Sequence, residues 1–275
     1  MPCTDPTDKD DLIAAFIATY KGSEAASPEE LVRQYHRVTQ YTAKHPDKGS
    51  AAVSSAVDLP RPRVRTWVDR GGMPDAARGM QVAEGHGWFD LSWETPMCHT
   101  LTIAVAWIFS GGSINEMWAP SFAVTENTRA FADSVYEALG VGARTVRSDD
   151  DGRATELLPA ADGSVLGRVL SALGAPTGSK TPDSEVSLPP WLSEAPDDVR
   201  RAFAQTFVFN RGVERQNRPQ TPVQIKTTRS DEFREDIQAL CESVTAESAV
   251  TGDSEVWRLT APAAFQLYQA PEIPS

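Results

Sequence analysis

Hydrophobic residues in the first third of the chain recur at helical spacing and are interrupted by helix breakers. An apolar stretch over residues 12–20 predicts a first short helix. Ser27, Pro28 and Glu30 are typical of a second helix start, because serine caps free amides and proline fits the first turn. That helix is expected to end at His45–Pro46, since the residue before a proline disfavours helix. This part of the chain is predicted to be all-α.

Residues 48–70 have the spacing of two short helices joined by a tight turn. The turn is expected at Asp58, a residue type that tolerates a left-handed backbone, and the second helix is expected to pack through Val64 and Trp67. The stretch VSSAVDLPRPRVRTW, residues 53–67, resembles the helix-turn-helix of homeodomain-like, transposase and resolvase modules, whose pattern runs I-A-x-x-L-G-V-S-x-x-T-V-x-R-W. The resemblance implies a recognition helix that enters the major groove of duplex DNA.

The remainder of the chain repeats one order of elements. Apolar helices expected over 101–109 and 199–209 are each followed by a strand, an amphipathic helix (127–139 and 230–244), a strand pair and a closing helix. Four residues recur at a constant offset of 102, namely Pro120, Phe131, Val135 and Leu157 as Pro222, Phe233, Ile237 and Leu259. An internal repeat of this kind predicts a pseudo-twofold domain.

These patterns predict an α+β fold with two domains. The first is an N-terminal all-α helix-turn-helix domain over residues 1–95, and the second is a duplicated αββαββα domain over residues 96–275. The two repeats are expected at about 98–175 and 195–270.

The repeat unit resembles the LAGLIDADG homing-endonuclease fold. The first motif helix is AVAWIFSGGS at 104–113, and the second is AQTFVFNRGV at 204–213. The resemblance implies that the halves pack through these helices and present a curved sheet surface to double-stranded DNA. The domain combination is similar to that of the bacterial sporulation regulator WhiA, with the opposite order along the chain.

The catalytic part of that motif is degenerate. In active members of the family, the acid before the motif glycine binds a divalent metal. Here Gly111 precedes Gly112 and Arg211 precedes Gly212. The resemblance therefore implies a domain that has lost hydrolysis, so the protein is expected to have no catalytic residue, metal or cofactor.

The charge distribution qualifies the DNA-binding hypothesis. The formal net charge is −12, and six of the 26 bases are lysine, a composition typical of halophilic archaea; an acidic mesophile protein is the alternative. Excess negative charge disfavours nucleic-acid partners. Residues 44–70 nevertheless carry +3, and residues 211–229 carry +4. Basic islands of this kind are what phosphate contact requires.

Candidate DNA contacts come from the recognition helix and from the strands of both repeats. They are Lys48, Ser50, Arg61, Arg63, Arg65, Thr66, Arg70, Arg144, Arg147, Arg153, Arg215, Arg218, Gln224, Lys226 and Arg229. Arginine and glutamine can bind phosphates or base edges.

Cysteine and apolar patterns favour a soluble protein of a reducing cytoplasm. Cys3, Cys98 and Cys241 are widely spaced and odd in number, and each is predicted to be a small buried hydrophobe. The longest apolar run, 101–109, is far shorter than the roughly 18 residues of a membrane helix. The four histidines lack metal-ligand spacing.

The sequence thus favours a sequence-specific DNA-binding transcription regulator, with duplex DNA as its partner and with a homodimer or the transcription machinery as further expected partners. Two alternatives stay open. One is a metal-dependent homing-type endonuclease that has recruited other acids, such as Glu116 or Asp231. The other is a module whose sheet surface binds a protein or a small molecule.

Overall fold

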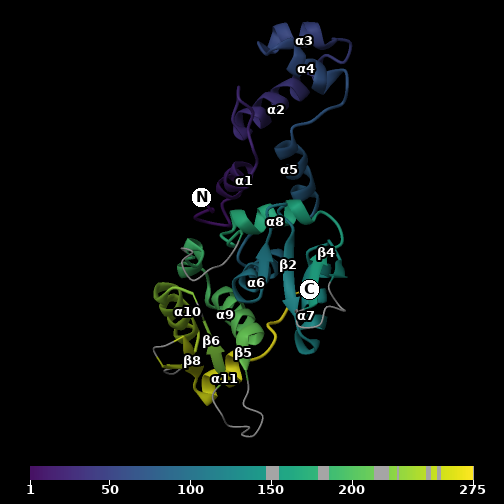
Figure 1. Cartoon of the computed structure of the whole chain (residues 1–275). Coiled ribbons are helices and arrows are strands. Elements are labelled where there is room, and N and C mark those ends of the chain that lie inside the picture. Colours follow the sequence, from purple (N-terminus) through teal and green to yellow (C-terminus); the bar gives the residue numbers. More distant parts are fainter. Residues whose placement is uncertain are drawn as a thin grey trace.

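The protein has a mixed α+β fold, as predicted, in an elongated molecule with α3 and α4 at one end and α11 at the other (Figure 1). The computed structural model describes residues 1–146, 155–178, 186–213, 223–227, 229–245, 249–252 and 255–274.

Five helices form the N-terminal part of the described chain. They are α1 (Lys9–Ala18), α2 (Pro28–Lys44), α3 (Ser50–Val57), α4 (Arg61–Val68) and α5 (Asp75–Gly85). The start of α2 follows its sequence signal, because Ser27 Oγ accepts a hydrogen bond from the Glu30 amide at 3.2 Å. Capping of this kind satisfies one of the amides that a helix start leaves unpaired.

The order helix-strand-strand-helix-strand-strand-helix then occurs twice. The first half has α6 (Pro96–Ser110), β1 (Gly112–Ile114), β2 (Pro120–Val124), α7 (Glu126–Ala138), β3 (Ala143–Val146), β4 (Thr155–Pro159) and α8 (Gly163–Ala172). The second half has α9 (Asp197–Arg211), β5 (Gly212–Val213), β6 (Gln224–Lys226), α10 (Asp231–Ser243), β7 (Val250–Thr251), β8 (Val256–Leu259) and α11 (Ala261–Leu267). The two antiparallel sheets have equivalent strand orders, β1-β2-β4-β3 and β5-β6-β8-β7.

The prediction that equivalent positions of the two halves are separated by a constant 102 residues was wrong. Gly112 pairs with Phe122, whereas Gly212 pairs with Ile225, so the first strands differ by 100 and the second strands by 103. The helices α7 and α10 start at 126 and 231, an offset of 105. With that offset, each buried position of α7 falls on a buried position of α10: 128, 132, 135 and 136 correspond to 233, 237, 240 and 241. Loops of different length change the offset, but the spacing of the buried positions within the helix stays the same.

The two halves meet through α6 and α9. Every residue of α6 from Thr100 to Ser110 is buried, which is typical of a helix surrounded by protein on all sides. The Phe109 and Phe203 ring centroids lie 5.7 Å apart across this contact. At the C-terminal ends of the helices, Asn210 Nδ2 donates to Ser110 Oγ at 3.0 Å. This helix pair is the centre of the large hydrophobic core, which draws residues from both halves.

A second, smaller core lies in the helical part. Val38, Val53, Val57 and Val64 form a separate buried cluster. We call the unit built on it, residues 34–70, the helical head. Helices α1 and α5 instead pack against α8, and the large core runs without a break across residue 95, where the sequence placed a domain boundary.

Arg168 of α8 joins α1 to the first half. Its guanidinium lies 3.9 Å from the Tyr20 ring centroid and 4.4 Å from the Trp118 ring centroid, and it donates to the Thr19 carbonyl. Cation–π contacts of this type are stronger when they are partly desolvated. Burial raises the pKa of Tyr20 to about 12, so the ring stays neutral beside the guanidinium.

In the part of the chain that the structure describes, no helix is both long enough and apolar enough to cross a membrane. The cysteines are buried free thiols, as predicted. Burial raises the pKa of Cys3, Cys98 and Cys241 to about 12 each.

We expect the native thiols to be inert to a disulfide reagent at pH 8, because the nucleophile is the thiolate and all three groups are buried. Unfolding in denaturant should release three reactive thiols, and the variant Ala25→Cys, at an exposed position, should add one that reacts in the native state. Burial of the neutral thiols also links the free energy of unfolding to pH. Since the pKa values of the folded thiols exceed the ordinary value of 9.0, the stabilisation from keeping them protonated is complete below pH 9 and is lost as pH rises towards 12. Stoichiometric native labelling of the unmodified chain would contradict the burial described here.

Candidate nucleic-acid interface

The turn between α3 and α4 has the backbone that the sequence predicted. Asp58 is left-handed, with φ of 49° and ψ of 55°, and it ends α3. Arg37 Nη2 from α2 donates to the Val57 carbonyl at 2.7 Å, which satisfies a carbonyl of the last turn of α3. The helix α4 follows after three residues, as in a helix-turn-helix.

The two sides of α4 differ in character. Val64 is buried in the head core, and Trp67 packs against that core, with its ring 5.6 Å from the Tyr35 ring. Most of the basic residues that the sequence analysis named in this region are exposed. Arg61, Arg65, Thr66 and Arg70 are exposed, as is Lys48 just before α3. The head therefore exposes cationic side chains along α4 and next to both α3 and α4.

Two candidate contacts of the head are used inside it. Ser50 is buried, and its Oγ donates to Asp69 Oδ2 at 2.7 Å, which ties the start of α3 to the end of α4. Arg63 is half-buried, and its Nη1 donates to Gln34 Oε1. The expectation that these side chains face DNA is corrected: their spacing places them on the helices, but the fold turns them towards neighbouring elements. Asp69 also lies 3.9 Å from Arg65 Nε, an exposed pair.

The first sheet offers one described cation from the candidate set. Arg144 is exposed on the edge strand β3, opposite Leu158 of β4. Glu156 lies on the same face of the sheet, opposite Ala123 and Val146. Candidates Arg147 and Arg153 lie outside the described residues.

The second sheet brings more positive charge together. Gln224 and Lys226 alternate with buried Ile225 on β6, so they share the opposite face. Arg258 of β8 lies directly opposite Gln224, and its Nε is 3.0 Å from the Gln224 amide oxygen in the orientation that satisfies both groups. Candidates Arg215 and Arg218 lie outside the described residues.

Arg258 was missed by the sequence analysis. It alternates with buried Trp257 and Leu259, so the period-two pattern of residues 256–259 could have placed it on the face of Lys226.

The degenerate motif lies where α6 and α9 end. Gly111 follows the last residue of α6, and a Cβ atom there would lie 2.4 Å from Asn210 Nδ2. At Gly112 a Cβ would lie 2.7 Å from the Ser121 carbonyl oxygen, a backbone atom. A side chain at Gly111 would therefore displace Asn210, and one at Gly112 would push the first two strands apart. Arg211 is the last residue of α9 and is exposed, and Gly212 begins β5.

Arg229 does not lie on an open sheet face, which corrects its expected role in surface contact. Its guanidinium lies over the Phe233 ring, 4.6 Å from the centroid, and its Nη2 donates to the Phe109 carbonyl at the end of α6. Burial, with the neighbouring charge of Arg211, lowers the pKa of Arg229 to about 10. A cation at this end of α6 is favoured by the helix dipole.

The acids named for the nuclease alternative lie in separate halves. Glu116 is exposed in the turn between β1 and β2, and Asp231 starts α10, where it pairs with Arg234 at 2.6 Å. Among the residues the structure describes, no three His, Cys, Asp or Glu side chains gather as a metal site would require.

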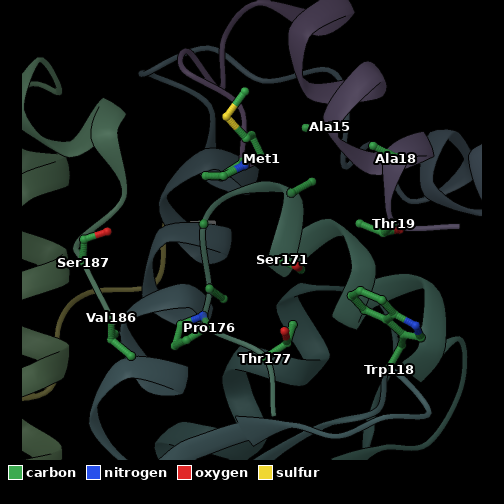
Figure 2. A pocket seen from close by; sticks show the side chains of 14 residues that line it. Met1, Ala15, Ala18, Thr19, Trp118, Ser171, Pro176, Thr177, Val186 and Ser187 are labelled. Atoms are coloured by element: carbon green, nitrogen blue, oxygen red, sulfur yellow. The ribbon is translucent and has the colours of Figure 1, made fainter. Parts of the chain in front are cut away.

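A hollow of about 400 Å³ lies between α1 and the residues at and after the end of α8. Figure 2 shows its walls, with Ala15 and Ala18 of α1 and the adjoining Thr19 on one side and Ser171 of α8 and the later Thr177 on the other. The described side chains that line it are apolar or carry hydroxyl groups.

No protein-family model matches this chain, and a search of curated proteins finds none that matches it.

We expect Arg63→Ala to lower the free energy of unfolding of the head by about 1–2 kcal/mol, since it removes a charge-assisted hydrogen bond and leaves Gln34 unsatisfied. The matched variant Arg61→Ala removes the same charge from the same helix at an exposed position, and it should stay within about 0.5 kcal/mol of the unmodified protein. Hydrogen exchange of the backbone amides of α3 and α4, followed across a denaturant series, would measure both changes. Equal effects of the two variants would contradict the division between packed and exposed arginines.

Proposed function

We propose that the protein is a sequence-specific double-stranded DNA-binding protein that acts in transcription regulation, with the helical head as its principal DNA-binding unit. The observation that carries the proposal is a set of exposed basic side chains, Arg61 and Arg65 on α4 and Arg70 just beyond its end, on a helix that buries Val64 in the head core. A recognition helix needs this arrangement, because one side must pack on the module while the other contacts bases and phosphates.

The geometry of the turn supports the same proposal. Asp58 reverses the chain within three residues, and Arg37 and Ser50 fix both ends of α3 through hydrogen bonds. A rigid unit of this kind loses little conformational freedom on binding, which favours specific recognition.

We further propose that the two halves form a LAGLIDADG-like domain. The double αββαββα order, the equivalent sheets and the contact between α6 and α9 support this resemblance. In such a domain the face with Lys226 and Arg258 would add a second DNA surface.

The resemblance to the LAGLIDADG fold also favours a domain without nuclease activity. Gly111 and Arg211 stand where active members have metal-binding acids, and neither side chain is a ligand for Mg²⁺. The positive charge of Arg211 would also repel the ion.

We expect the double variant Arg61→Ala with Arg65→Ala to weaken duplex binding at least tenfold, because each arginine lost removes a contact worth about 1–3 kcal/mol. If the two side chains contact phosphates, the salt dependence of log K should also become shallower by about two. Fluorescence anisotropy with a selected duplex across a KCl series would measure both quantities.

The matched control is the double variant of two exposed arginines outside the head that are not candidate DNA contacts, Arg78→Ala with Arg129→Ala. It removes the same charge, so a loss of binding caused by net charge alone would appear there too. Undiminished binding by the α4 variant would overturn the assignment of the recognition helix.

A further inference from the structure

Two arginines lie where the C-terminal ends of α6 and α9 meet. Arg211 ends α9 and is exposed, while Arg229 lies against Phe109 and Phe233 with its Nη2 on the Phe109 carbonyl. The Asn210–Ser110 hydrogen bond joins the same two helix ends. The ends of α6 and α9 and the first turn of α10 are therefore held in one arrangement by packed and hydrogen-bonded groups.

Within the described part of the chain, no acid pairs with the charges at this junction. Among the described residues neither Arg211 nor Arg229 forms a salt bridge, and the nearby Asp231 is paired with Arg234. Arg229 is destabilised in its charged form by burial and by Arg211, which lowers its pKa to about 10. The helix dipoles offset only about half a charge each, which is less than the two full charges present.

One polar atom at the junction lacks a partner. Arg229 Nη1 is buried and has no hydrogen-bond acceptor among the described residues. Buried donors in native proteins are nearly always satisfied, and an exception calls for an explanation such as a bound water or ion. A neutral water would satisfy Nη1 but would leave the repulsion between the two guanidiniums in place.

We propose that Arg211 and Arg229 form a binding site for an oxyanion of the phosphate class at the junction of α6 and α9. One anion bound between the guanidiniums would give Nη1 its missing acceptor and would replace repulsion by two attractions. Arginine suits this ligand, because its planar group presents parallel N–H donors to phosphate oxygens. The site therefore takes a negative ligand where metal-binding acids are expected in an active nuclease of the LAGLIDADG type.

The experiment titrates inorganic phosphate against the full chain at constant ionic strength, with thermal unfolding as the measurement. We expect a saturable rise in the melting temperature, since a ligand that binds only the folded state stabilises it. Arg211→Gln should weaken phosphate binding about tenfold, because it removes charge-assisted hydrogen bonds. Because Arg211 is exposed, Arg211→Gln should leave the fold intact. The variant Arg229→Lys tests the more buried arginine and keeps its positive charge.

The matched control Arg78→Gln removes an exposed arginine from α5 and should bind phosphate as the unmodified chain does. If phosphate has no saturable effect, or if Arg211→Gln and Arg78→Gln respond alike, the site does not exist.

A second titration distinguishes the source of the phosphate group. If the site takes a DNA phosphodiester, Arg211→Gln should make the salt dependence of duplex binding shallower by about one, and free phosphate should compete with the duplex. If it takes free phosphate alone, the salt dependence should not change. Neither arm uses Arg61 or Arg65, so a failure of the DNA-binding proposal for the head would leave the phosphate result interpretable.

Discussion

The burial of α6 against α9 is the constraint on which the rest of the structure depends. A helix that is apolar on all sides has no face to offer water, so it must be enclosed by other elements. The second half supplies α9, and the first half covers the remaining sides with α7, α8 and its sheet. Because each half ends its central helix with a turn straight into a strand, the paired helices also bring both sheets and the degenerate motif to one place. The helical part is attached to this centre through α1, α5 and the Arg168 contacts with Tyr20 and Trp118.

Local sequence signals were sufficient for the elements and for the turn of the head. Ser27 caps α2 and Asp58 adopts a left-handed backbone, because both effects act within a few residues. The constant offset between the halves failed for a physical reason: insertions in loops change the spacing of matched positions but leave their burial pattern intact. Exposure of polar side chains was harder to predict, since it depends on distant partners. Ser50 meets Asp69 and Arg229 meets Phe109, and neither contact is visible in the spacing of the chain.

The local charge of the surface differs from the net charge of the chain. A chain with a net charge of −12 repels nucleic acid at long range, so any contact with DNA must come from places where cations are concentrated. The exposed side of α4 is one such place, and the face with Lys226 and Arg258 is another. Salt at high concentration would shorten the range of the repulsion more than it weakens direct contacts, because the Debye length falls to about 3 Å at 1 M. The proposed regulator is therefore compatible with the halophile-like composition of the chain.

Selection of random duplexes by the full-length protein, in high KCl with Mg²⁺ present, tests the central claim most directly. The sequence of the bound duplexes and the state of their ends are determined together. The account predicts an enriched motif on duplexes with intact ends, and it predicts that the motif is lost with the Arg61→Ala, Arg65→Ala variant. Duplexes cut at the enriched motif would contradict the loss of nuclease activity, and the absence of any enriched motif at every salt concentration would contradict DNA recognition itself.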